Sequence, residues 1–108
     1  MKIRFESQKT TIRLRKDEFS EYLDKNELIE STIFPDGKQF TFHLKLSDEK
    51  SFAVNDGFFH ICLPQKVIRN YSPSKVGISF EFQLDNTKPH LLIFEVDIKK
   101  KPLNSRTS

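Results

Sequence analysis

Basic side chains near the start of the chain have the types and spacing to contact phosphate groups. Six of them are candidates: Lys2, Arg4, Lys9, Arg13, Arg15 and Lys16. Residues two apart on a strand project to the same side, so Arg13 and Arg15 would share a face opposite Ile12 and Leu14. Two guanidinium groups on one exposed face suit nucleic-acid phosphates. The alternative is a basic strand face that contacts only solvent. The formal charge of the whole chain is +3 at pH 7, which permits a nucleic-acid partner but does not demand one.

A second candidate site is a protein contact formed by Phe58 and His60. On a strand these two side chains would point away from Phe59 and Ile61. An aromatic ring exposed beside a histidine would suit contact with a partner protein. The alternative is packing inside a core that is rich in phenylalanine, since the chain has eleven Phe residues.

The sequence gives less evidence for a metal site or for catalysis than for the two binding surfaces. His60 and Cys62 would share a strand face, but a zinc site would also need His43 or His90 to converge on them. The three glycines do not form a phosphate-binding loop, and no hydrolase or metalloprotease motif occurs. We therefore predict no metal site, no cofactor and no enzymatic activity.

The length of 108 residues predicts one domain with a single core. A single cysteine rules out an intramolecular disulfide, and no apolar run approaches membrane-spanning length. The charged N-terminal stretch lacks the apolar segment of a signal peptide, so we expect a cytoplasmic protein without a membrane partner. We expect residues 99–108 to form a basic, flexible tail.

Apolar residues that alternate with polar ones predict strands, separated by turn-forming residues. The expected strands are residues 2–5, 11–15, 28–34, 38–46, 51–54, 58–63, 76–84 and 91–98. Helices are expected from residue 16 to about residues 24–26, where Phe19, Tyr22 and Leu23 form one stripe, and over residues 64–71. Pro-Asp-Gly and Asn-Asp-Gly sequences mark two hairpin turns.

The order of elements is the same in both halves of the chain, with an offset of 49 residues. At this offset Ile12 meets Ile61, Leu14 meets Leu63, and Tyr22 meets Tyr71; Phe42 and Leu44 meet Leu91 and Ile93. The alternative is coincidence between two β-rich segments. We predict an α+β, mostly β fold, in which duplicated ββαββ units, residues 1–47 and 50–98, close one small barrel with two short helices. Such a chain is expected to be a monomer.

The second half, with Ile61-Cys62-Leu63-Pro64 before a short helix, resembles the swapped-hairpin units of the AbrB/MazE family. The resemblance implies two interlocked units, here in one chain as in MraZ-like members. It also implies DNA binding through basic residues of the first hairpins. The Gly-Arg step of that family is absent here, and the second hairpin has no arginine.

The opening Met1-Lys2-Ile3-Arg4 and the stretch from Arg13 to Phe19 resemble a small family of uncharacterised bacterial proteins of about this length. That resemblance implies no known activity. Taken together, the sequence predicts a small non-enzymatic bacterial protein that is a nucleic-acid-binding or regulatory module. The alternative is a protein–protein interaction module that binds no nucleic acid.

Overall fold

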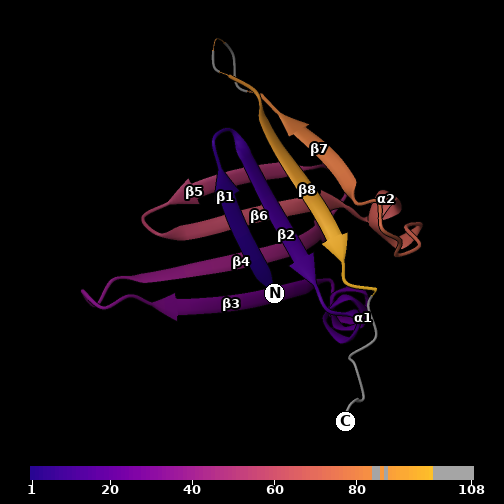
Figure 1. Ribbon diagram of the computed structural model, residues 1–108, viewed down its shortest axis with the longest axis horizontal. Coiled ribbons are helices and arrows are strands. Elements are labelled where there is room, and N and C mark those ends of the chain that lie inside the picture. Colours follow the sequence, from indigo (N-terminus) through magenta and orange to yellow (C-terminus); the bar gives the residue numbers. More distant parts are fainter. Residues whose placement is uncertain (84–85, 87, 99–108) are drawn as a thin grey trace.

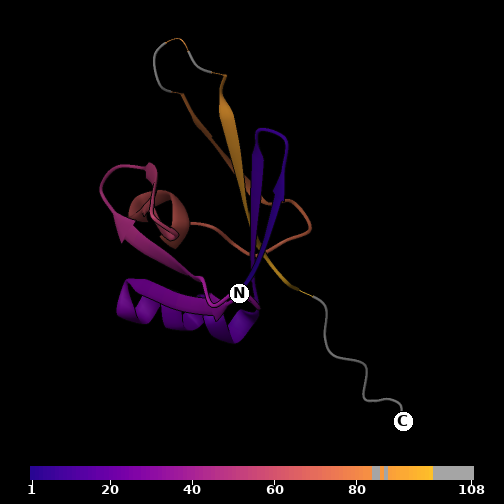
Figure 2. The ribbon, with the colours of Figure 1, turned by 90° about the vertical axis from the view of Figure 1, so that its left-hand side faces the viewer.

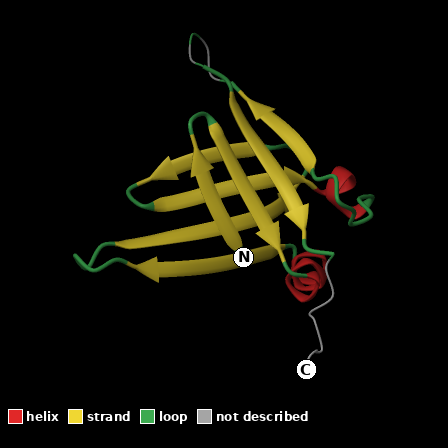
Figure 3. Cartoon of the chain, viewed as in Figure 1, coloured by secondary structure: helices red, strands yellow, loops and turns green. Residues whose placement is uncertain are grey.

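The computed structural model describes residues 1–83, 86 and 88–98. Its described strands form two four-stranded sheets (Figures 1 and 3). Sheet A has the order β1 (Lys2–Glu6), β2 (Lys9–Leu14), β8 (His90–Val96) and β7 (Ile78–Phe82). Sheet B has the order β3 (Glu27–Ile33), β4 (Gln39–Ser47), β6 (Phe58–Pro64) and β5 (Ser51–Asn55). The helices are α1 (Lys16–Lys25) and α2 (Gln65–Arg69).

The predicted single closed barrel is not found, because the described strands lie in two separate sheets. Figure 2 shows the hairpin β1–β2 of sheet A standing clear of sheet B at its tip. The inner faces, which look toward each other, meet through large rings; Phe5 of β1 stacks on Phe59 of β6 at 5.5 Å between centroids. Side-chain packing of this kind holds two sheets too far apart for their edges to exchange backbone hydrogen bonds.

Each sheet combines one hairpin from each half of the chain. The hairpin β1–β2 joins β8–β7 through the parallel pair β2–β8, and the hairpin β5–β6 joins β4–β3 through the parallel pair β4–β6. The connections within each half therefore cross from one sheet to the other. Neither half forms a sheet from its own strands alone, so the two halves depend on each other for folding.

The strand registers of the first half repeat in the second half, with one residue shift for the first hairpins and another for the second hairpins. Adding 49 to both members of the pair Lys2–Arg13 in β1–β2 gives Ser51–Cys62, which is a pair in β5–β6. For the second hairpins the shift is 50, because the pair Leu28–Leu44 becomes Ile78–Phe94. The second half thus has one additional residue between its two hairpins.

The shift of 50 corrects the expected alignment of the last strand. Leu44 corresponds to Phe94, which is buried, and not to Ile93, which is only partly buried. Alternate strand residues point to opposite faces, so a one-residue error moves every side chain to the wrong side of the sheet. The expected offset of 49 would also match Ile29 with Ile78; the observed register instead matches Leu28 with Ile78, and Ile29 is largely exposed.

Both helices lie on the same side of the molecule (Figure 3). Helix α1 begins at Lys16, with Asp17 and Glu18 in its first turn, where acidic groups interact favourably with the helix dipole. It ends at Lys25, and the next residue, Asn26, caps it with a left-handed φ of 65°. Helix α2 follows Pro64 and is half as long, with five residues against ten. The expected helix over residues 64–71 is confirmed in position but is shorter at both ends.

The core lies between the sheets beside the helices. Its fully buried members come from both halves: Ile12, Leu14, Tyr22, Leu63, Ile68, Leu92 and Phe94. Tyr22 of α1 donates a hydrogen bond to the Lys45 carbonyl at 3.1 Å. Its counterpart Tyr71, only partly buried, donates to the Val76 carbonyl at 2.9 Å. Equivalent positions therefore build one shared core.

Most expected strands are confirmed in place, with changes at their ends. Residue Val76, expected on a strand, precedes β7 and is exposed. The expected tail at residues 99–108 and part of the turn before β8 lie outside the described residues. Within the part of the chain that the structure describes, neither helix has the length and apolar character to cross a membrane.

Candidate functional site

Four of the six candidate phosphate contacts lie on the outer face of sheet A, the face turned away from sheet B. Lys2 and Arg4 come from β1, and Lys9 and Arg13 come from β2. The register places Lys2 directly opposite Arg13. Alternation sends these side chains outward because their neighbours Ile3, Ile12 and Leu14 pack into the core.

Carboxylates share this outer face with the basic groups. Arg4 Nε lies 3.5 Å and Lys9 Nζ lies 3.6 Å from Glu6 Oε1, and Arg13 Nη2 lies 3.7 Å from Asp97 Oδ1. All of these groups keep a substantial exposed area. Ion pairs at such distances on an exposed surface are weak, so the cations stay available to a stronger anion.

The other two candidates, Arg15 and Lys16, lie at the start of α1 and not on this face. Arg15 holds Asp17 through two hydrogen bonds, Nε to Oδ1 at 3.0 Å and Nη2 to Oδ2 at 3.2 Å. The hydrogen bond to Arg15 keeps the pKa of the Asp17 carboxyl below its ordinary value. Arg15 therefore serves the helix N-terminus, and the structure does not bring all six cations together.

A cleft of 970 Å³ adjoins the basic residues of the outer face. It is lined by Lys2, Arg4, Thr11, Arg13, Ser74 and Lys75 among others. Lys75 comes from the loop between α2 and β7, so no local sequence pattern indicated that it would lie beside the first hairpin. Glu95 is the one carboxylate among the described residues of this lining. The cleft is therefore richer in cations than the rest of the face.

Thr11 supplies the most unusual polar group of this cleft. Its side-chain oxygen is buried and, among the described residues, is the one such side-chain atom without a hydrogen-bond partner. A buried polar group that lacks a partner costs about 1–3 kcal/mol. The hydroxyl can donate to an anion or accept from a donor group, and Thr11 is one of the residues that line the cleft.

The candidate protein contact lies on the outer face of sheet B. Phe58 and His60 stack with 4.4 Å between ring centroids, and His43 lies 5.6 Å from His60. Phe58 is partly buried and His60 is exposed, with the exposed side chain of Ile29 on the edge strand of the same face. The two residues are thus brought together as the alternation predicts, away from Phe59 in the core.

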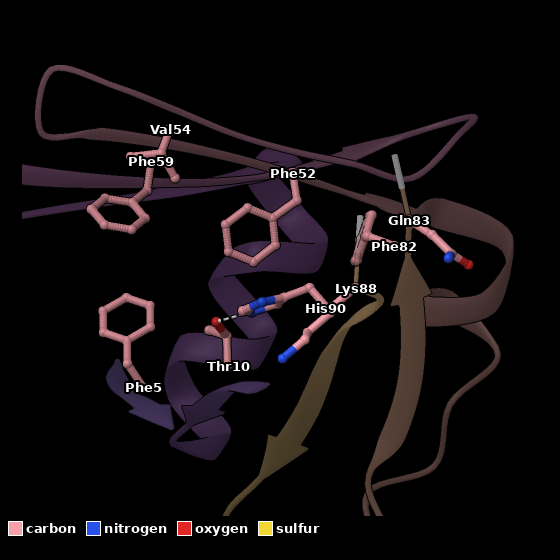
Figure 4. A pocket seen from close by; sticks show the side chains of 9 residues that line it. All are labelled: Phe5, Thr10, Phe52, Val54, Phe59, Phe82, Gln83, Lys88 and His90. Carbon is pink, nitrogen blue, oxygen red and sulfur yellow. Dashed lines mark hydrogen bonds between the residues drawn. The ribbon is translucent and has the colours of Figure 1, made fainter. Parts of the chain in front are cut away.

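Sequence reasoning missed a cavity of 540 Å³ between the two sheets. Figure 4 shows Phe5 and Phe59 at one end of it, and Thr10, Lys88 and His90 toward the other end, beside Phe52 and Phe82. The Thr10 hydroxyl and His90 Nε2 are joined by a hydrogen bond of 2.7 Å. Thr10 and His90 are 80 residues apart in the chain, and only the parallel pairing of β2 with β8 brings them together.

The histidines do not converge on Cys62. His43 Nε2 bonds to Glu27 Oε1 at 2.7 Å on sheet B, whereas His90 belongs to sheet A. The described residues contain no group of three or more His, Cys, Asp or Glu placed to hold a metal ion.

The fold and these surfaces define a mostly β domain of two four-stranded sheets, with hairpins exchanged between its halves. A family profile matches residues 1–102, so the chain belongs to a family of unknown function, DUF7009. Neither a curated protein nor a solved structure matches the chain. The surfaces themselves must therefore carry the functional argument.

Proposed function

We propose that the protein is a small non-enzymatic module that binds the phosphates of a nucleic acid through the outer face of sheet A. The observation that carries the proposal is the cleft lined by four cations, Lys2, Arg4, Arg13 and Lys75, and by Thr11, whose buried hydroxyl has no hydrogen-bond partner. Cations supply the sequence-independent part of nucleic-acid affinity, and a buried hydroxyl adds a donor for a phosphate oxygen.

The carboxylates on the same face are compatible with this role. Exposed ion pairs contribute about 0–1 kcal/mol each, so a phosphate can replace Glu6 beside Arg4 or Asp97 beside Arg13 at little cost. Arginine also forms forked hydrogen bonds with phosphate oxygens, which the single long contacts to these carboxylates do not provide.

The exchange of hairpins between the two halves supports the resemblance to interlocked AbrB/MazE-like units and an origin by internal duplication. In that family the first hairpins contact DNA, and here the first hairpin carries the cations. The equivalent positions of the second hairpin are Ser51, Ala53 and Cys62. We therefore propose one-sided contact by a monomer, which a measurement of molar mass in solution would test.

The test is fluorescence anisotropy with a labelled duplex over a range of salt concentrations. The key variant carries Lys2→Ser, Arg4→Ala and Arg13→Ser, which gives the first hairpin the polarity of the second. Four phosphate contacts predict a slope of log affinity against log salt of about −3.6 for the natural chain. The variant should lose at least about tenfold in affinity at low salt, with a slope near −0.9.

A matched control removes three cations elsewhere, through Lys16→Ala, Lys25→Ala and Lys45→Ala. It has the same net charge as the key variant but keeps the cleft. An equal loss in both variants would reduce the proposal to a general charge effect. No binding of the natural chain to single-stranded or duplex nucleic acid at low salt would end it.

The second candidate function is a protein–protein interaction module, favoured by the aromatic stack of Phe58 and His60 on an outer sheet face. Partly exposed aromatic rings beside an exposed aliphatic side chain are typical of contact surfaces. Affinity capture with the natural chain and with Phe58→Ser tests it. A partner that both proteins retain equally, or no partner at all, would contradict this function.

A further inference from the structure

The cavity between the sheets is separate from the basic face, because it opens on the inner side of sheet A. Its apolar lining is formed by Phe5, Phe52, Val54, Phe59 and Phe82. Its volume of 540 Å³ lies within the range of about 300–1,000 Å³ that is usual for small-molecule sites. Five apolar side chains from two sheets and a few polar groups at one end are the usual composition of such a site.

The apolar lining is incompletely covered by the protein itself. Phe5 is 51% exposed and Val54 is 53% exposed, although both belong to the inner faces that elsewhere form the core. These two residues are equivalent under the shift of 49, so they face the cavity from corresponding places in β1 and β5. Covering such surface with an apolar group is favourable by about 25 cal/mol per Å².

The polar end is built from groups that hold one another in place. The fully buried Thr10 fixes the ring of His90 through their 2.7 Å hydrogen bond, and Phe52 packs against the same ring edge-on at 5.4 Å. Lys88 lies on this side of the cavity (Figure 4). No carboxylate occurs among the described residues that line it. The polar end is therefore suited to an anion.

The corresponding place in the other half has no such polar group. Thr10 corresponds to Phe59, and His90 corresponds to Phe40 under the shift of 50. The rings of Phe59 and Phe40 lie 6.0 Å apart, and Phe34 closes on Phe40 at 5.0 Å. In one half, the rings of Phe59 and Phe40 fill this place. In the other half, Thr10 and His90 leave part of it open as the cavity, so close packing does not require these two polar residues.

We infer that this cavity binds a small organic acid with an aromatic or branched apolar body, whose carboxylate faces Lys88 and His90. The body would lie against Phe5, Phe52 and Phe59, and Lys88 would supply the charge that selects the acid. The site is independent of the basic face of sheet A. Binding of an acid in the cavity and binding of phosphates on the basic face can therefore be confirmed or refuted separately.

Isothermal titration with 4-phenylbutyrate tests the inference, with the neutral 4-phenylbutanamide as its matched partner. The acid is expected to bind with a dissociation constant of about 1 mM or tighter. The amide should bind at least tenfold more weakly, because it lacks the charge that Lys88 would meet. This comparison needs no altered protein, so it does not depend on the folding of a variant.

Two lysine variants locate the site. Lys88→Gln should weaken the acid at least fivefold and leave the amide unchanged, whereas Lys38→Gln should have no effect. Lys38 is the residue that corresponds to Lys88 under the shift of 50. The basic-face variant described above should bind the acid like the natural chain. Equal binding of acid and amide, equal effects of both lysine variants, or no binding of either compound would overturn the inference.

Discussion

In the first half of the chain, Ile12 and Leu14 occupy the core places that Ile61 and Leu63 occupy in the second half. On the outer faces of the same hairpins the correspondence ends, since Arg13 becomes Cys62. Buried positions are constrained by close packing, where even one methylene group matters, whereas exposed positions are free to change. The comparison therefore separates buried residues that the fold requires from exposed residues, such as Arg13, that are available for a function.

The largest expected effect concerns the shared core. Leu14→Ala and Leu63→Ala each remove a fully buried side chain, and each should lower the free energy of unfolding by about 3 kcal/mol. Because the residues are equivalent, the two losses should agree within about 1 kcal/mol. Urea denaturation measures both. A difference larger than about 2 kcal/mol would show that the two halves are not energetically equivalent.

The hairpin turns offer a contrast in backbone strain. Gly57 has a φ of 81°, and a Cβ added there would lie 2.8 Å from the Gln39 carbonyl oxygen. Gln8 holds the equivalent place in β1–β2 with a φ of 59°. Gly57→Ala should cost about 2 kcal/mol, through strain and that contact. Gln8→Gly relieves the positive φ but removes the hydrogen bonds that Gln8 Nε2 donates to the Lys88 and Pro89 carbonyls, so it should be close to neutral. Thermal unfolding that ranks them in the opposite order would contradict this reading.

The starts of the two helices differ in charge. Glu18 accepts a hydrogen bond from the Arg15 backbone N–H at 2.9 Å, and its counterpart under the shift of 49 is the exposed Val67. Burial pushes the pKa of the Glu18 carboxyl upward, but that hydrogen bond and the nearby amino group of Met1 outweigh it, so the pKa lies below its ordinary value. Ionised Glu18 therefore stabilises the folded state.

Glu18→Gln should accordingly lower the free energy of unfolding by about 1 kcal/mol at pH 7. The contribution is present above the ordinary carboxyl pKa and is lost as pH falls through the lower pKa of the folded state, so the difference should shrink below about pH 4. Denaturation curves at several pH values measure it. A difference that stays constant down to pH 2 would contradict the assigned cause.

The smallest expected contrast between the two halves concerns the paired tyrosines. Tyr22→Phe removes a buried hydrogen bond to the Lys45 carbonyl and should cost about 1 kcal/mol. Tyr71→Phe removes a more exposed bond to the Val76 carbonyl and should cost about 0.5 kcal/mol or less. Burial also raises the pKa of the Tyr22 phenol, which keeps this donor protonated through the ordinary pH range. Urea denaturation measures both variants, and equal losses of unfolding free energy would contradict the expected difference between the two tyrosines.

Local patterns sufficed to predict the hairpins, both helices and the sides on which Arg13 and Phe58 lie. The one-residue change of offset was not predictable, because Leu91–Leu92–Ile93–Phe94 is apolar at every position and fits either face. The separation into two sheets depends on how inner rings such as Phe5 and Phe59 pack. The Thr10–His90 pair and the place of Lys75 depend on contacts between distant segments, for which the sequence contains no local signal.

The central claim of the proposed function is that the hairpin β1–β2 contacts phosphate groups, whereas the equivalent hairpin β5–β6 does not. Nuclear magnetic resonance of the ¹⁵N-labelled chain tests it most directly, by following backbone amide shifts while duplex DNA is added at low salt. We expect the amides of Lys2, Arg4 and Arg13 to shift, and those of Ser51, Ala53 and Cys62 to stay unchanged. Equal shifts in both hairpins, or shifts in neither, would contradict the claim.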